Sequence, residues 1–443
     1  MAKVAQLVQI NDSAEVTTWH YLADRKYILG GINYGARSDG KGGPIIVDVE
    51  NKQVKFIREI GGWAHWVGIY LTHRKMFVQF GQQSEKYGNE HFAVTVTDVE
   101  KLESTCYVYP NKLGSGDEFV SAVYDYKNRR FIVGTCRGFG MIFLINEEDL
   151  DKPDNWRKIY QFKNNPEITD LAIFNDTLYI ATCVEDGEVA VYTCPLDEIE
   201  NMGQYISKYL TSYAKNTFMY TAVGKEGLYI PYSDNNGKVY IRKINHEGGE
   251  VDIETPLVIN TNPSKTKDWH SNLACRFAGG NVLISWDDID NWVFHLLFYD
   301  VESGAIGKLV DGENGRVDKL SIAPNHENVV YFGVCDLGGR AVTTPCGVYS
   351  LIFDKYYKLV IEQMPSKVSP NKPFGIKVKV LDENGNPVPQ VTVCASFVDA
   401  LEVDDMHTVR DPSCTTTDNN GEATVYLTAP GTLGKYLIDI WLE

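Results

Sequence analysis

The sequence lacks the segments that carry a chain into or across a membrane. Residues 1–10 have neither the long apolar core nor the small-residue cleavage site of a signal peptide. No stretch approaches the run of about 18 apolar residues that a transmembrane helix needs. The sequence therefore predicts no membrane span and no classical secretion signal.

Catalytic and cofactor-binding motifs are also lacking. There is no G-x-S-x-G elbow, no P-loop, no H-E-x-x-H helix and no G-x-G-x-x-G turn that opens a helix after a strand. The sequence therefore predicts no cofactor and no metal, and it favours a protein that is not an enzyme. A glycosidase would leave no such motif, because its two carboxylates come from distant parts of the chain. An enzyme acting on polysaccharide therefore stays an alternative.

The nine cysteines form no C-x-x-C pair, which argues against a zinc ribbon or a thioredoxin-type site. Cys136, Cys183 and Cys335 follow similar apolar runs, where a small, half-buried thiol fits. Outside a reducing cytosol, two pairs are candidate disulfides: Cys335 with Cys346, and Cys394 with Cys414.

Basic residues are too few to balance the acidic ones. Lys and Arg number 42 against 59 Asp and Glu, which gives a formal net charge of -17. No Lys/Arg stripe stands out, and a net negative surface repels phosphate backbones, so no nucleic-acid partner is expected. Tyrosine is abundant, with 26 residues, and Gly and Asn are frequent, as is typical of a β-rich protein with many turns.

A short motif, a polar turn followed by an alternating apolar run, recurs along the chain. Its copies are spaced by about 47 to 55 residues, a period typical of propeller blades. Seven copies occur, at residues 24–30, 73–78, 128–134, 175–180, 225–230, 279–284 and 327–333. The repeat predicts a seven-bladed β-propeller over residues 1–355, although the G-H and W-D signature of one large propeller family is missing.

Each repeat can be divided into four strands, except the last, which lacks its outer strand. The N-terminal run Val4–Ile10 alternates and has the right length to supply it. Pairing the first strand with the last blade removes two sheet edges at once. We therefore predict an all-β chain whose propeller is closed by its N-terminal strand.

From about residue 356 the period breaks and short alternating strands follow a proline-rich boundary. The phrases VKVLDENGNPVPQVTV and TTTDNNGEATVYLTAPGTLGKYLIDI carry strong turn signals between these strands. They resemble bacterial immunoglobulin-like domains of the invasin and intimin type. The resemblance implies a small Ig-like β-sandwich over residues 356–443. Such domains are spacers and adhesive modules of cell-surface proteins, and they are appended to virion proteins of tailed phages.

Trp–His pairs begin the first strand of three predicted repeats, the strand that would line the central channel. These pairs are candidate ligand-binding residues. An indole beside an imidazole suits sugar stacking or a polar funnel. The alternative is that the tryptophans pack between blades while the histidines bond to backbone. Three histidines could also hold a metal, but their spacing over whole blades gives no ligand signature. The candidates are Trp19, His20, His65, Trp66, Trp269 and His270.

The loops after the repeated strands differ in length and chemistry, which is typical of a recognition face on a rigid scaffold. The alternative interpretation is that these loops are solvated turns whose sequences vary because nothing constrains them. Three loop arginines, Arg37, Arg137 and Arg340, are added to the candidate ligand-binding residues. The acidic run at residues 287–291 offers oxygen ligands but lacks the spacing of an EF-hand loop.

Together these patterns predict a non-enzymatic structural and binding protein. We expect a capsid decoration, spike or tail component of a virion, or another extracellular surface protein without a classical signal peptide. Its partners would be neighbouring subunits or a host-surface glycan or protein. The alternatives are a propeller glycosidase or lyase and an intracellular, cytoplasmic interaction scaffold.

Overall fold

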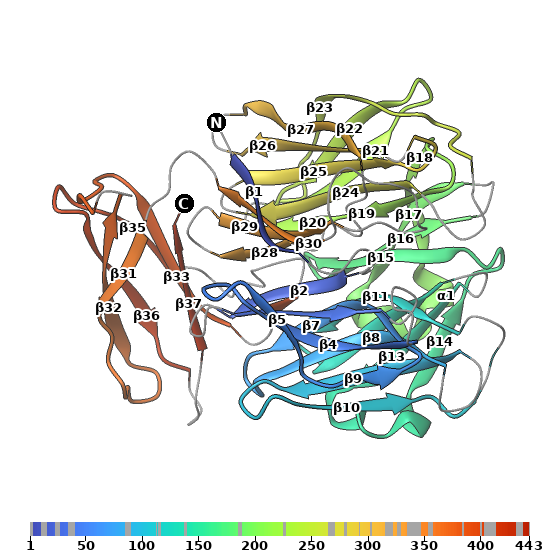
Figure 1. The fold of residues 1–443 in the computed structure, drawn as a ribbon, viewed down its shortest axis with the longest axis horizontal. Helices are drawn as coiled ribbons and strands as arrows, with labels where there is room; N and C mark the ends of the chain where they lie inside the picture. Colours follow the sequence, from blue (N-terminus) through green and yellow to red (C-terminus); the bar gives the residue numbers. More distant parts are fainter. Residues whose placement is uncertain are drawn as a thin grey trace.

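The computed structural model is an all-β protein (Figure 1). It describes residues 3–9, 16–22, 27–33, 40–84, 90–111, 113, 117–136, 140–184, 188–224, 227–264, 271–278, 281–291, 293–301, 304–314, 322–325, 329–334, 347–352, 358–382, 385–398, 401–402, 413–430 and 437–442. Up to residue 352 the described strands form seven sheets, numbered here in chain order. Six of the later strands form two smaller sheets, and the two-residue strand β34 (Leu401–Glu402) joins the second of the seven.

The first four sheets follow the predicted repeat, with four consecutive antiparallel strands in each. The first sheet contains β2 (Val16–Leu22), β3 (Tyr27–Ile32), β4 (Lys41–Asp48) and β5 (Gln53–Phe56), and the short β6 (Ile60–Gly61) also pairs with β4. The second contains β7 (Trp63–Leu71), β8 (Met76–Gln83), β9 (His91–Asp98) and β10 (Glu103–Val108). The third contains β11 (Phe119–Asp125), β12 (Arg130–Thr135), β13 (Met141–Asn146) and β14 (Arg157–Gln161). The fourth contains β15 (Glu167–Phe174), β16 (Thr177–Cys183), β17 (Val189–Pro195) and β18 (Ser207–Ser212).

The next two sheets depart from the simple repeat. The fifth contains β20 (Ala222–Gly224), β21 (Gly227–Ser233), β22 (Lys238–Ile244) and β23 (Glu250–Val258). The sixth contains β24 (Ser271–Ala278), β25 (Asn281–Asp288), β26 (Val293–Asp300) and β27 (Ile306–Asn314). An extra strand, β19 (Thr217–Tyr220), runs parallel to β24, so the chain that opens the fifth repeat belongs to two sheets.

The seventh sheet draws its outer strand from the other end of the chain. Its strands are β28 (Ile322–Asn325), β29 (Val329–Val334) and β30 (Gly347–Ile352), followed by β1 (Lys3–Gln9). β1 and β30 are antiparallel over six residue pairs, from Lys3 opposite Ile352 to Gln9 opposite Gly347. The pairing predicted for the N-terminal run is therefore confirmed.

Helices are short and lie in connections. Within the described residues, three are 3₁₀ helices and one is a single α-helical turn: η2 (Glu147–Asp149), η3 (Pro153–Asn155), η4 (Leu196–Asn201) and α1 (Met202–Tyr205). None of the helices in the described part of the chain combines the length and hydrophobicity that crossing a membrane requires.

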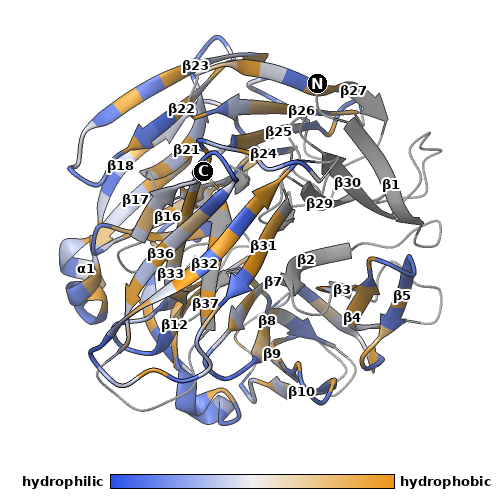
Figure 2. Cartoon of the chain, turned by 90° about the vertical axis from the view of Figure 1, so that its left-hand side faces the viewer, coloured by the Kyte–Doolittle hydropathy of each residue, from blue (hydrophilic) through white to orange (hydrophobic). Residues whose placement is uncertain are grey.

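The C-terminal region forms a two-layer sandwich. One sheet orders β31 (Lys358–Gln363), β32 (Pro373–Leu381) and β36 (Glu422–Thr428), and the other orders β35 (Ser413–Thr416), β33 (Thr392–Val398) and β37 (Leu437–Leu442). Their inward residues, among them Ile376, Val393 and Val425, form one buried core. Figure 2 views the molecule from the left-hand side of Figure 1, and there this sandwich lies in front of the middle of the seven sheets.

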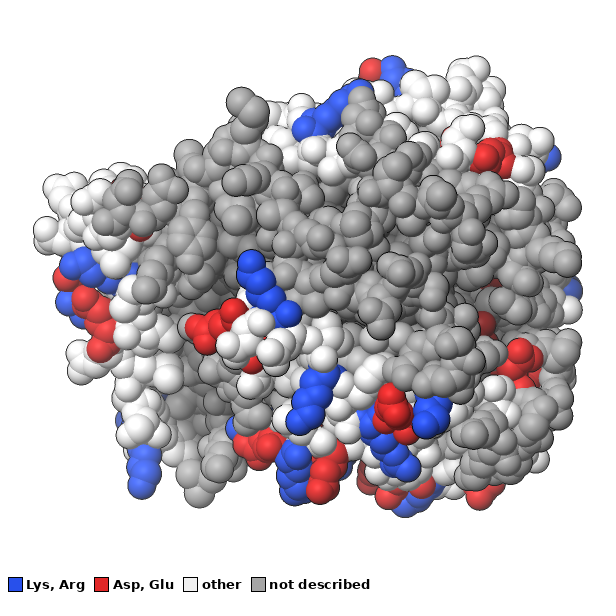
Figure 3. Space-filling view, in the orientation of Figure 1, with Lys and Arg blue, Asp and Glu red and all other residues white. Residues whose placement is uncertain are grey.

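Charges of both signs are interspersed on the surface. On the face drawn in Figure 3 many of the described Lys and Arg residues lie beside Asp and Glu residues. Several are paired, such as Lys75 with Glu100 at 2.6 Å and Lys101 with Asp98 at 2.7 Å. Exposed pairs of this kind contribute about 0–1 kcal/mol each, so they add little to stability.

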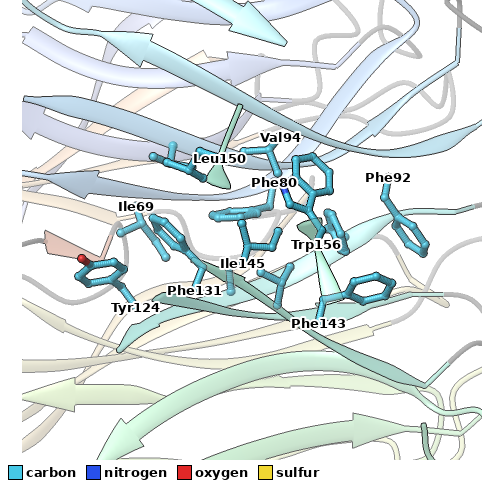
Figure 4. Close-up of a cluster of buried hydrophobic side chains, with 14 of the residues drawn as sticks. Ile69, Phe80, Phe92, Val94, Tyr124, Phe131, Phe143, Ile145, Leu150 and Trp156 are labelled. Carbon is cyan, nitrogen blue, oxygen red and sulfur yellow. The ribbon is translucent and has the colours of Figure 1, made fainter. Parts of the chain in front are cut away.

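The sheets pack face to face, so their middle strands are apolar on both sides. In β12 the side chains of Phe131 and Val133 join the core shared with the second sheet, whereas Ile132 joins the core shared with the fourth. Figure 4 shows the first of these cores, where aromatic rings gather between the two sheets. Phe92 stacks on Phe119 with ring centroids 4.6 Å apart. This packing explains why β12 is buried throughout rather than on alternate residues.

Candidate functional site at the first strands of the sheets

The predicted Trp–His pairs lie on the first strands of their sheets where the structure describes them. Trp19 and His20 lie in β2, and His65 and Trp66 lie in β7. The other predicted site residues are outside the described residues: Trp269, His270, Arg37, Arg137 and Arg340. The structure therefore brings two of the three pairs onto neighbouring strands, since β2 and β7 contact each other.

Both described pairs fall where the strand register shifts. The pairing of β2 with β3 shifts between Thr17 and His20, and that of β7 with β8 shifts between His65 and Val67. The first strands of the third and fourth sheets shift at the corresponding place, between Phe119 and Ser121 and between Ile168 and Asp170. A bulge leaves backbone groups outside the ladder and re-aims the side chains beside it. The Trp–His phrase therefore coincides with a recurrent bulge.

His65 lies inside the protein rather than at an open face. It has no exposed surface, and its ring stacks on that of Trp63 with centroids 4.3 Å apart. The indole Nε1 of Trp63 donates to the Thr95 hydroxyl at 2.8 Å, and that hydroxyl lies 3.1 Å from His65 Nε2. Burial lowers the pKa of His65 to about 3, although a hydrogen bond with the Ala64 backbone opposes the shift. The imidazole is therefore neutral in the folded protein at ordinary pH.

Trp63 and His65 also join the first sheet to the second. A Cβ built on Gly31 of β3 would lie 2.3 Å from the Trp63 ring, so glycine is needed for the indole to fit there. The backbone N–H of His65 donates to Asn33 Oδ1 at 2.9 Å. The sequence singled out Trp66, whereas Trp63 is the fully buried tryptophan of this strand. The predicted ligand-binding role of His65 stays a prediction, but here its ring and backbone contact protein.

We expect the buried His65 to make the protein sensitive to acid. Because its pKa is about 3 in the folded protein against the ordinary histidine value of 6.5, the unfolded chain binds more protons between these values. Stability should therefore fall as the pH drops from about 6.5 towards 3, by up to about 4 kcal/mol from this group. His65→Gln, whose amide can still bond to Thr95, should flatten this dependence. Chemical denaturation at pH 7 and pH 5 measures the difference, and an equal loss in both proteins would contradict it.

Polar side chains at the bulges bond across sheet boundaries. The Ser121 hydroxyl donates to the carbonyl of Ile168 at 2.7 Å, which joins the third sheet to the fourth. The Thr169 hydroxyl donates to the carbonyl of Met219 at 3.1 Å, which joins the fourth sheet to β19. Ile168 lies beside the register shift of β15, and since a bulge removes a carbonyl from its own ladder, the Ser121 hydroxyl satisfies a group that the bulge releases.

A second polar group explains why the opening strand of the fifth repeat is divided. Thr221, between β19 and β20, donates its N–H and its hydroxyl to Asp170 Oδ2 at 2.6 and 2.8 Å. Its carbonyl accepts from Arg276 Nη1 at 2.7 Å, and the Arg276 guanidinium lies over the Tyr220 ring. The strand is divided here because side chains of two neighbouring sheets take the backbone groups of Thr221 that a ladder would use.

The acidic run at residues 287–291 is used within the fold. Asp287 is buried and accepts from Asn272 Nδ2 at 2.9 Å. Asp288 accepts from the N–H of Asp290 at 2.9 Å, which closes a local turn. Asp290 in turn accepts from the N–H of Ser264 at 3.0 Å. The three carboxylates therefore have different partners instead of converging on one point. Among the described residues, no group of three or more His, Cys, Asp or Glu side chains is placed to hold a metal.

The C-terminal sandwich reaches the same first strands. The two-residue strand β34 (Leu401–Glu402) pairs antiparallel with β7, with Leu401 opposite Tyr70 and Glu402 opposite Ile69. It lies on the edge of β7 that faces away from β8. This contact was not predicted, because a two-residue pairing between distant parts of a chain leaves no periodic signal.

One of the two candidate disulfides is present in the sandwich. Cys394 in β33 and Cys414 in β35 are bonded and lie directly opposite each other in the sheet. Cys335 and Cys346 are outside the described residues. Cys136 and Cys183, predicted as buried thiols, are 6% and 1% exposed, so their burial is confirmed.

Comparison with known families supports the sandwich but not its predicted type. Residues 359–439 match the family model of the macroglobulin domain MG4, which is an Ig-like β-sandwich. The match lies within the predicted domain 356–443 and covers less than a fifth of the chain. The invasin and intimin type is not shown by this comparison. A search of the curated proteins gives no significant match.

Proposed function

We propose that the chain is a non-enzymatic structural and binding protein of a virion or another extracellular assembly. In this proposal residues 1–355 form a seven-bladed β-propeller closed by β1, and residues 356–443 form an Ig-like module mounted on it. A C-terminal β-sandwich is indicated both by the resemblance to invasin and intimin domains and by the macroglobulin match. The proposed function requires a sandwich there and not one particular type of it.

The contacts between first strands are the observation that carries the propeller. β2 contacts β7, β7 contacts β11, β11 contacts β15, and the series continues through β19, β20 and β24 to β28. β28 in turn contacts β2, so the series returns to its start. Together with the pairing of β1 and β30, this cyclic order supports a ring in which each blade is covered by two neighbours. Such a ring is a rigid support for loops that differ from blade to blade.

The disulfide supports a destination outside a reducing cytosol. Disulfides persist in secreted, surface and virion proteins and are rare in the cytosol, where glutathione and thioredoxin keep thiols reduced. The Cys394–Cys414 bond therefore favours the extracellular or virion alternative over a cytoplasmic scaffold.

Quantitative mass spectrometry of purified particles, cell envelopes and cytosol tests this function. We expect the chain to be enriched at a fixed ratio to other subunits in particles or envelopes, with Cys394 and Cys414 oxidised. Recombinant protein should bind a component of that assembly or of the host surface without consuming it. Recovery only in the cytosol with reduced cysteines would contradict the proposal. So would polysaccharide cleavage that His270→Ala abolishes.

A further inference from the structure

β31, the first strand of the C-terminal sandwich, has one edge that no strand in the described part of the chain borders. Its other edge pairs antiparallel with β32. In Figure 2 β31 lies at a margin of the sandwich, beside β32. Ile361 near its end is 50% exposed, and Met364 just beyond it is 49% exposed. An exposed edge of this kind offers backbone N–H and C=O groups to a further strand.

The backbone groups of Leu359 and Ile361 point toward this free edge. Leu359 lies opposite Val380 of β32. The Val380 N–H, however, donates to the Gly421 carbonyl at 2.8 Å, and the Val380 carbonyl accepts from the Val388 N–H at 2.9 Å. In an antiparallel pair, opposite residues alternate between those that exchange both hydrogen bonds and those that exchange none. Leu359 is therefore of the second kind, as is Ile361 two residues further on, and each offers an N–H and a C=O to the free edge.

The sequence of β31 is complementary to a second copy of itself. In an antiparallel pair centred on Val360, Leu359 of one copy lies opposite Ile361 of the other, and Lys358 lies opposite Glu362. Leu359 and Ile361 are the residues whose backbone groups face the free edge, so in this register they bond to each other. Aliphatic pairs and opposite charges directly across two strands stabilise their pairing. The free edge therefore fits a second copy of the chain in backbone direction, apolar contact and charge.

The outer edge of the fifth sheet shows the opposite pattern. β23 also forms a sheet edge, and it is longer than β31. If a second copy of β23 paired with it about Asp252, Glu250 would lie opposite Glu254 and Asp252 opposite itself. Like charges directly opposite each other destabilise a strand pair, and charged side chains are a usual protection of sheet edges. The register centred on Val360 in β31 contains no such repulsion.

We propose that the C-terminal sandwich binds a second copy of this chain through the free edge of β31, with a two-fold axis at Val360. The N–H groups of Leu359 and Ile361 in both copies donate across the axis, so about four backbone hydrogen bonds join the copies. The register of β31 shifts beyond Ile361, so the regular edge is short. One short strand from each copy makes a smaller contact than a permanent dimer has, so the dimer separates on dilution. This pairing does not depend on the proposed function.

Sedimentation equilibrium of the full chain tests the dimer, at concentrations up to about 1 mM. Salt of about 0.15 M screens the repulsion between the two acidic chains. We expect a reversible monomer–dimer equilibrium. Ile361→Pro removes an N–H that faces the free edge and leaves the bonds to β32 in place. It should raise the Kd of the dimer at least about tenfold, because two hydrogen bonds across the axis are lost. Ile361→Val, which keeps the N–H, is the matched control and should dimerise like the wild type.

Hydrogen exchange identifies the surface that the dimer uses. The amides of Leu359 and Ile361 should exchange more slowly as the protein concentration rises. The Val360 amide, which points toward β32, should exchange slowly at every concentration. A dimer that leaves the exchange of Leu359 and Ile361 unchanged would use another surface and would overturn the proposal.

A charge exchange tests the register without altering the backbone. Lys358→Glu places like charges opposite each other at both ends of the strand pair and should raise the Kd about tenfold. Adding Glu362→Lys to that variant restores opposite charges and should restore dimerisation. If Ile361→Pro fails to fold, these two variants decide the outcome. A wild type that stays monomeric at every concentration, or a Lys358→Glu protein that dimerises as the wild type does, would overturn the proposal.

Discussion

Replacing Glu147 with alanine is expected to lower the free energy of unfolding by about 1–3 kcal/mol, the usual cost of leaving a buried polar group, here the Tyr124 hydroxyl, without its hydrogen-bond partner. Glu147 follows β13 in the third sheet, and its side chain is only 9% exposed. Its carboxylate lies 3.0 Å from His73 Nε2 and 3.2 Å from Arg74 Nη1, both in the second sheet's first hairpin. The Tyr124 hydroxyl donates to it as well, and Arg129 lies 3.5 Å away.

The stabilisation that the Glu147 carboxylate provides should decrease at acidic pH. Burial raises the pKa of Glu147, but hydrogen bonds from His73 and Tyr124 and the nearby positive charges outweigh it and lower the pKa to about 2. The ionised form therefore stabilises the fold fully above pH 4.5, and this stabilisation is lost as the pH falls through about 2. Glu147→Gln should remove this part of the acid sensitivity.

Urea unfolding of the Glu147→Ala and Glu147→Gln proteins at pH 7 measures the loss in the free energy of unfolding. Glu148 is the matched control, because it is the next residue in the same turn and its side chain is exposed. Glu148→Gln should change stability by less than about 0.5 kcal/mol. If Glu147→Ala were as mild as Glu148→Gln, the link between the second and third sheets would not contribute as we describe.

Removing residues 1–9 is expected to destabilise the protein more than Glu147→Ala does, because it disrupts the seventh sheet. The deletion takes away β1 and its six residue pairs with β30. At about 1 kcal/mol net for each hydrogen bond, the loss is roughly 4–6 kcal/mol. It also exposes a new sheet edge, which favours association between chains. We therefore expect the shortened chain to unfold at lower urea concentration and to aggregate. A chain that lacks only residues 1–2, which precede β1, is the control and should behave like the full chain.

The strands could be predicted from the sequence because their signals are local. Each copy of the repeat combines a polar turn with an alternating apolar run, and these determine a hairpin without reference to the rest of the chain. The position of β1 followed from counting, since the last repeat lacked one strand. The pair Cys394 and Cys414 could be named because each lies in a short strand of the same small domain.

The side-chain contacts between the first strands of neighbouring sheets could not be predicted, because they join residues far apart in sequence. Asp170 and Arg276 act on Thr221 from 51 and 55 residues away and divide an otherwise regular strand. His65 has the sequence context of a ligand-binding residue, but its burial depends on Trp63 and Thr95, whose packing only the fold sets. The same limit applies to the pairing of β34 with β7.

Ring closure is the claim on which the propeller, and with it the proposed scaffold, depends. Hydrogen exchange of the β30 amides in the full chain and in the chain without residues 1–9 tests it most directly. If β1 closes the ring, amides of β30 that face β1 should exchange as slowly as those of β29 in the full chain and should lose protection when β1 is removed. Rapid exchange in the full chain, or equal protection with and without β1, would contradict the closed seven-bladed ring.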